Sequence, residues 1–113
     1  MNRVGKEGES AAADFLRASG YRIIETNFRT FFGEVDIIAL DSGITVFVEV
    51  KTRSGSAYGS PFEAVTLKKQ EKIRKVALFY MKKKKQELEI RFDVVSITTA
   101  AGGRRIEHIK DAF

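Results

Sequence analysis

Two carboxylates and a lysine interrupt stretches that otherwise read as β-strands. Asp36 lies within the aliphatic run 35–40, and both Glu49 and Lys51 lie within the run 44–53. Facing carboxylates repel each other, which raises one pKa or calls for a cation between them. Mg²⁺ suits such a pair because it takes one or two carboxylates together with water and phosphate oxygens. With a lysine to stabilise charge on a phosphate, these residues are suited to metal-assisted hydrolysis of phosphodiesters.

The turn between the two runs decides whether the charges meet. Residues 42–43 (Ser-Gly) form a two-residue connection, which predicts a β-hairpin and fixes its register. In that register Asp36 lies directly opposite Glu49, with Cβ atoms roughly 4.5–5.5 Å apart. The same register places Glu34 opposite Lys51.

Side-chain alternation divides the second strand into two faces. Glu49, Lys51 and Arg53 share one face, and the valines of 46–50 share the other, which we expect to be the core face. The charged face has a simpler interpretation as a solvated surface with a salt bridge between Lys51 and one carboxylate, because short motifs have many chance matches.

The residues around this hairpin resemble a known nuclease motif. Asp36 followed by Glu49-Val50-Lys51 is similar to the PD-(D/E)XK motif, with Val35 where that motif has proline. More narrowly, the segments 33–39 and 47–53 resemble the small bacterial YraN-like family, which is itself similar to archaeal Holliday junction resolvases. The likeness extends over nearly the whole chain.

This resemblance implies an α/β fold with a restriction-endonuclease-like core, in which a central mixed β-sheet is flanked by helices. It implies a nuclease that uses Mg²⁺ or Mn²⁺ and acts on DNA, with branched or repair-intermediate DNA as the substrate and a homodimer as the assembly. The implied catalytic residues are Asp36, Glu49, Lys51, Glu9 and Gln70, and the implied metal ligands are Asp36, Glu49, the Val50 carbonyl and Glu9.

Two of these residues have equally simple alternatives. Glu9 would complete the metal site from the first helix, but it is also what a solvated first-turn glutamate looks like, because the helix dipole favours it there. Gln70 would reach the reacting water or a phosphate from the second helix. Its alternative is an amide that bonds to the backbone at the sheet edge.

Positive charge is concentrated in one segment. The whole chain has a net charge of +5, yet residues 68–85 alone hold nine basic residues and one acidic residue, so the remainder is net negative. A basic stripe of this kind indicates a nucleic-acid interface, although a solvated helix face carries similar charges. The expected nucleic-acid contacts are Lys68, Lys69, Lys72, Lys75, Arg53 and Tyr58, the last within a Gly/Ser-rich connection.

Composition sets the outer bounds. With 113 residues, 43% of them hydrophobic, the chain is expected to form a single nuclease-like domain over residues 1–113. The chain has no cysteine for a disulfide or a thiolate zinc site, and no apolar stretch long enough for a membrane helix or signal peptide. We therefore expect a cytoplasmic protein. The sole histidine, His108, lacks the partners of a histidine-based site and is expected to be structural.

Hydrophobic periodicity predicts the order helix, three strands, helix, two strands. The predicted elements after the hairpin are a helix over 67–83 capped by Thr66, a strand over 88–97 and a short strand over 104–109; before it come a helix over 4–19 and a strand over 21–29. The connection 30–33 carries Phe31 and Phe32, which we expect to pack in the core, with base stacking as the alternative.

Three functions remain open from the sequence. The first is a metal-dependent DNA endonuclease, the second is a catalytically inactive nucleic-acid-binding module, and the third is a protein-interaction domain whose basic helix meets an acidic partner. Asp36 and Glu49 favour catalysis, because carboxylates beside a phosphate path hinder binding unless a metal is present.

Overall fold

The predicted order of elements is confirmed. The structure, a computed structural model, describes residues 3–54, 65–100 and 102–113. Its elements are α1 (Arg3–Ala18), β1 (Arg22–Thr30), β2 (Gly33–Asp41), β3 (Ile44–Ser54), α2 (Leu67–Lys84), β4 (Ile90–Ala100) and β5 (Gly103–Ile109).

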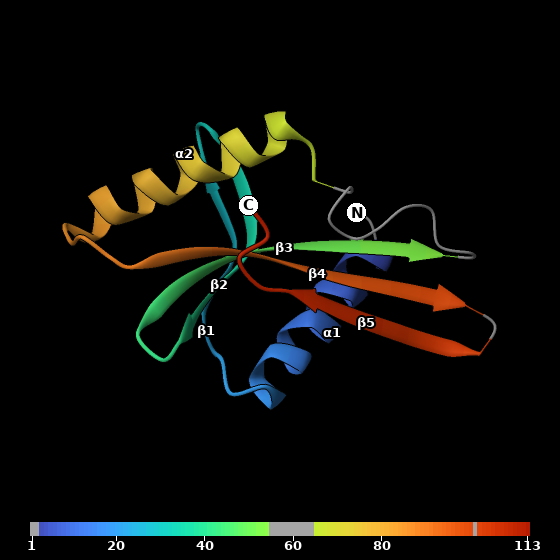
Figure 1. Ribbon diagram of the computed structural model, residues 1–113. Helices are drawn as coiled ribbons and strands as arrows, with labels where there is room; N and C mark the ends of the chain where they lie inside the picture. The colour runs from blue at the N-terminus through green and yellow to red at the C-terminus, as the bar shows by residue number, and fades with distance from the viewer. Residues whose placement is uncertain (1–2, 55–64, 101) are drawn as a thin grey trace.

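The five strands form one mixed sheet in the order β1-β2-β3-β4-β5. Neighbouring strands are antiparallel except for β3 and β4, which run parallel because the chain crosses over through α2 between them. Figure 1 shows α2 on one side of this sheet and α1 on the other. The predicted fold class is therefore confirmed, and the architecture is that of a restriction-endonuclease-like core.

Local signals explain where the helices begin and end. The Thr66 side chain accepts a hydrogen bond from the Lys69 N–H at 3.2 Å and caps α2 as predicted. Lys85 ends α2 in the left-handed conformation, and Gly20, with a φ of 95°, follows α1. In the part of the chain that the structure describes, no helix is long and apolar enough to cross a bilayer.

Both faces of β3 are buried, so the prediction of a single core face was incomplete. Val46 and Val48 pack with Leu16 of α1 in one cluster. Phe47, which points the other way, packs with Ile73 of α2 in a second cluster. A strand covered by helices on both faces reads as a nearly continuous apolar run, which is what 44–50 shows apart from Thr45 and Glu49.

The close approach of α1 to β3 depends on Gly8. A Cβ atom at this position would overlap the Thr52 side chain. The absence of a side chain therefore lets α1 lie directly on β3 near its C-terminal end, which accounts for a glycine in a helix where it lowers helix propensity.

Candidate active site

The predicted turn of the β2–β3 hairpin is confirmed, and so is its register over the residues that pair. Ser42 and Gly43 have positive φ values of 50° and 89°, as a two-residue hairpin turn requires. The strand pairs continue in the predicted register as far as Ile37 and Val48. Asp36 and Glu49 are the next residues on their strands.

The two carboxylates interact. The side chain of Glu49 is buried, with 3% exposed, and its charge acts on the Asp36 carboxyl. Burial raises the pKa of Asp36 from 3.8 to about 8, and the negative charge of Glu49 adds to this, while a hydrogen bond from the Val50 N–H opposes it. That bond measures 2.8 Å from the Val50 nitrogen to Asp36 Oδ2. The raised pKa of one carboxylate agrees with the expectation from the sequence, and a metal ion between the two stays a prediction.

An irregularity in β2 lies at this site. Val35 packs in the cluster under α2, whereas Ile37, two residues on, packs in the cluster under α1. Regular alternation would place both on one face, so the strand is rotated at Asp36. Asn27, between the neighbouring paired positions of β1, has a positive φ of 52°. The distortion thus spans both strands and sets the direction of the Asp36 side chain.

The predicted position of Glu34 opposite Lys51 is wrong. The paired register of β2 and β3 ends before these residues, because β2 is distorted at Asp36. Glu34 Oε2 instead forms an ion pair with Arg29 Nε on β1 at 2.7 Å. Lys51 turns to the carboxylate on its own strand.

Two ammonium groups neutralise Glu49. The distance from Glu49 Oε2 to Lys51 Nζ is 3.4 Å, and that to Lys69 Nζ is 2.5 Å. Burial alone would lower the pKa of Lys69, but the hydrogen bond and charge of Glu49 outweigh it and the pKa is raised. The sequence assigned Lys69 to phosphate contact only. Its place in the first turn of α2, next to the inward-facing Gln70, was the available signal for a contact with the carboxylates.

The two accessory residues lie differently from the central pair. Glu9 Oε1 accepts a hydrogen bond from Asn27 Nδ2 at 2.8 Å, and its charge contributes to the raised pKa of Asp36. Glu9 is thus near the pair. Gln70 Nε2 donates to the Val65 carbonyl at 3.1 Å, which is the backbone contact of the alternative interpretation. Asn27, which the sequence analysis did not single out, holds Glu9 beside the site.

The donor set fits a metal that brings most of its own ligands. Within residues 3–54, 65–100 and 102–113, no three His, Cys, Asp or Glu side chains converge on a point that could hold a metal ion. Mg²⁺ nevertheless needs only one or two carboxylates when waters and phosphate oxygens complete its shell. Asp36 and Glu49 meet that requirement, and the role of the Val50 carbonyl stays a prediction.

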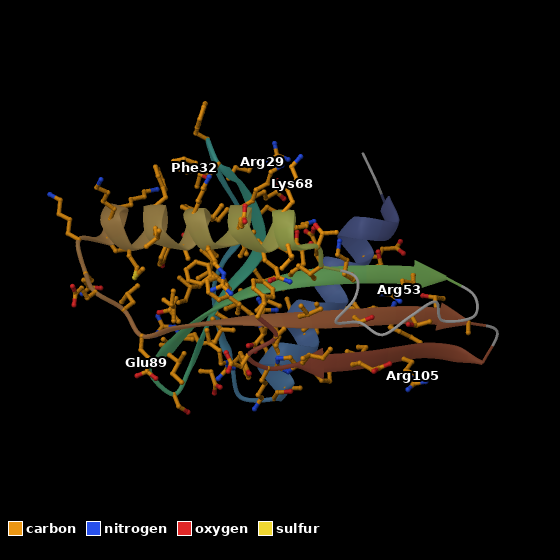
Figure 2. The ribbon with its side chains drawn as sticks, turned by 45° about the horizontal axis from the view of Figure 1, so that its top comes forward. Arg29, Phe32, Arg53, Lys68, Glu89 and Arg105 are labelled. Carbon is orange, nitrogen blue, oxygen red and sulfur yellow. The ribbon has the colours of Figure 1, made fainter. Side chains whose placement is uncertain are left out.

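A basic groove adjoins the pair. It has a volume of about 440 Å³ and lies between the β1–β2 hairpin and α2. Figure 2 shows Lys68 on α2, while Arg53 lies farther toward the end of β3. Of the predicted nucleic-acid contacts, Lys68, Lys69 and Lys72 line the groove, Lys75 lines the next cavity along α2, and Tyr58 lies outside the described residues.

A second charged network, centred on Asp93, was missed by the sequence analysis. Asp93 is fully buried in β4 and accepts hydrogen bonds from Arg91 and from His108 Nε2, the latter at 2.8 Å. Burial alone would raise the pKa of Asp93, but these bonds hold it far below its usual range. The His108 ring also contacts Phe15 of α1 edge-on. His108 is therefore structural, as predicted.

The raised pKa of Asp36 predicts how stability changes with pH. In EDTA between about pH 4 and pH 8, the folded protein keeps a proton on Asp36 that the unfolded chain has already lost. The contribution of this residue to stability is therefore complete below pH 4, and it decreases as the pH rises to about 8. Asp36→Asn mimics the protonated form and still accepts the Val50 N–H. At pH 9 it should be more stable than the wild type by at least about 1 kcal/mol, since one pKa unit is about 1.4 kcal/mol.

Urea unfolding of both proteins from pH 3 to pH 9 measures this difference. Asp14→Asn is the matched control, because Asp14 is an exposed carboxylate on α1 paired only with the exposed Arg17. Its effect should not vary with pH above 5. If Asp36→Asn were less stable than the wild type at pH 9, Asp36 would be an ordinary salt-bridge carboxylate, and the interpretation as a repelling pair would be rejected.

Comparison with known proteins adds the family. The uncharacterised protein family UPF0102 matches residues 8–97 of this chain. A UPF0102 protein of Thermodesulfovibrio yellowstonii is 47% identical, with 97% of this chain and 95% of that protein covered. UPF0102 proteins of Syntrophus aciditrophicus and Symbiobacterium thermophilum are each 51% identical, with 98% of this chain and 88% and 96% of those proteins covered. These matches span the carboxylate pair and the basic helix together, and they place the chain in the uncharacterised protein family UPF0102.

Proposed function

We propose that this protein is a divalent-metal-dependent DNA endonuclease that hydrolyses phosphodiester bonds. The observation that carries the proposal is the pair of the half-buried Asp36 and the buried Glu49, where two carboxylates interact at the end of a strand ladder and the pKa of Asp36 is raised to about 8. Groups with strongly perturbed pKa values gather at functional sites. Carboxylates held in this way are stabilised when a cation binds between them.

The residues of the pair would hold Mg²⁺ or Mn²⁺, with Glu9 and the Val50 carbonyl as further expected ligands. When bound, such a metal polarises the phosphate and lowers the pKa of water. Lys51 would orient the attacking water or stabilise charge that develops on the phosphate. Lys69, which contacts Glu49, would donate a hydrogen bond to a phosphate oxygen at this site.

The DNA path in this proposal follows the basic groove. Lys68, Lys69 and Lys72 line it, and Lys69 also contacts Glu49, so the groove leads to the carboxylates. Contacts from lysines to phosphates supply most of the non-specific affinity for DNA. Branched or repair-intermediate DNA as the substrate and a homodimer as the assembly remain part of the proposal through the resemblance to resolvases.

A second candidate is a binding module that has no chemistry. The favouring observation is that Lys51 and Lys69 already neutralise Glu49, so the carboxylate has cationic partners without a metal. In that case DNA binds along the lysines of α2 while the pair remains an internal ion-pair network.

Metal binding distinguishes the two candidates. Isothermal titration calorimetry at pH 7.5 should show Mg²⁺ or Mn²⁺ binding to the wild type and none to the double variant Asp36→Asn/Glu49→Gln. Because ligands that bind only the folded state stabilise it, a metal at 100 times its Kd should raise the unfolding free energy of the wild type by about 2.7 kcal/mol. The double variant should melt at the same temperature with and without metal.

The matched control replaces two exposed carboxylates, Asp14→Asn and Glu71→Gln, and should bind metal like the wild type. Equal binding by the wild type and the Asp36/Glu49 double variant would reject the assignment of the metal site.

A further inference from the structure

Two phenylalanines are exposed at the tip of the β1–β2 hairpin. Phe31 is 96% exposed and Phe32 is 43% exposed, so the expectation that they pack in the core was wrong. They are the two turn residues between the paired Thr30 and Gly33. Turns favour Gly, Asn, Asp, Pro and Ser. Aromatic rings that stay in water contribute no hydrophobic stabilisation to the fold. Their position calls for a functional explanation.

The turn holds the rings in place. Thr30 Oγ1 accepts a hydrogen bond from the Phe32 N–H at 3.0 Å and donates one to the Gly33 carbonyl at 3.1 Å. The rings of Phe31 and Phe32 meet edge to face, with centroids 5.7 Å apart. Because the turn is already ordered, binding of a partner to these rings costs little of the protein's conformational entropy.

A cavity connects these rings with α2. It has a volume of about 520 Å³, and its lining residues combine apolar and cationic side chains: Phe31, Phe32, Lys75, Leu78, Phe79 and Lys82. The lysine-lined groove of the proposed active site precedes it along the same helix, from Lys68 to Lys72. In Figure 2, Phe32, at the tip of the β1–β2 hairpin, lies farther toward the C-terminal end of α2 than Lys68 does.

The two cavities follow one another along a single face of α2 and outline a path over it. Lys68, Lys72, Lys75, Phe79 and Lys82 follow one another at intervals of three and four residues. The distance along the helix from the first to the last is about 21 Å at 1.5 Å per residue.

We propose that this path binds a single-stranded segment of DNA, with an unpaired base stacked on Phe31; the proposal rests on the proposed nuclease function. Aromatic rings beside a positively charged groove are the usual means of binding single strands, because every base has an apolar face and every nucleotide a negative charge. A second copy of this chain fits poorly, because a two-fold contact would bring Lys75 and Lys82 against the same lysines. An apolar peptide would leave both lysines without an anionic partner.

Fluorescence anisotropy in EDTA tests the proposal with a labelled single strand of about 12 nucleotides and a blunt duplex of equal length. Phe31→Ala should bind the single strand roughly 5- to 100-fold more weakly and the duplex almost unchanged. Phe31→Trp should bind the single strand like the wild type, whereas Phe31→Leu, apolar without an aromatic ring, should not. Melting temperatures confirm that the exposed substitutions leave the fold intact.

Salt dependence separates stacking from charge. Lys72→Gln should reduce the slope of log affinity against log salt by about 0.7 on the single strand, and Phe31→Ala should leave the slope unchanged. Equal affinity of the wild type and Phe31→Ala for the single strand would overturn the proposal, as would a dimer that Phe31→Ala converts to monomers in sedimentation. Failure of the nuclease function alone appears as wild-type protein that cleaves nothing in Mg²⁺ while the Phe31 effect persists.

Discussion

Glu49→Gln is expected to reduce Mg²⁺-dependent DNA cleavage by more than about 100-fold, since altering even the outer partners of a metal ligand costs 10- to 100-fold. The substitution keeps the shape of a buried side chain and removes its charge. It also removes the anionic partner of Lys51 and Lys69. A panel of duplex, single-stranded, flap and four-way DNA, each with Mg²⁺, Mn²⁺ or EDTA, measures the loss and identifies the preferred substrate.

Glu71→Gln is the matched control for this change. Glu71 is an exposed glutamate on α2, close in sequence to Lys69 and Lys72 but not part of the carboxylate pair. The control should cleave like the wild type. Cleavage by Glu49→Gln at the wild-type rate would show that the activity lies elsewhere. If the wild type cleaved none of the substrates, the binding module would be favoured.

Asp93→Asn is expected to destabilise the protein by about 3 kcal/mol or more, as is usual when one partner of a buried ion pair is removed. Oδ1 of Asp93 accepts from Arg91 Nε and the Asp111 N–H, and Oδ2 accepts from Tyr21, Arg91 Nη2 and His108. An amide has one acceptor, so in either orientation its NH₂ group faces at least two donors. Chemical unfolding at pH 7 measures the loss.

The matched control is Asp14→Asn, which removes an exposed carboxylate from an exposed ion pair and should change stability by less than about 0.5 kcal/mol. Because the pKa of Asp93 is lowered in the folded state, its contribution is present above the ordinary pKa of an aspartate and decreases as the pH falls below it. The difference between Asp93→Asn and the wild type should therefore shrink in acid. A constant difference from pH 7 to pH 2 would contradict the charged role of Asp93.

The part of the site that the sequence predicted depends on short-range geometry. The contact of Asp36 with Glu49 follows from the two-residue turn, because strand pairing from a known turn is a matter of counting. The paired register itself ends at Ile37 and Val48, and counting fails at Glu34, because the distortion of β2 at Asp36 depends on both neighbouring strands. A local irregularity of this kind has no clear sequence signal apart from an asparagine within a strand.

The remaining features depend on how elements pack together. The contact between Lys69 and Glu49 depends on where α2 lies over the sheet. Hydrophobic periodicity predicts the helix but not this position. The Asp93 network joins residues as distant as Tyr21 and His108. For Phe31 the sequence did give an expectation, and it was wrong. Phenylalanines in general prefer cores, but this one lies exposed in a turn.

The hydrogen bond from the Val50 amide to the Asp36 carboxylate makes one backbone nitrogen a spectroscopic probe of the site. Its proton resonance reports the charge of a single side chain, since a bond to a charged acceptor is shorter and stronger than one to a neutral acceptor. In a ¹⁵N-labelled sample, loss of the Asp36 proton and arrival of a divalent cation would therefore act on the same cross-peak. Chemistry at the carboxylates can thus be followed by NMR at a main-chain position, without any label attached to the site.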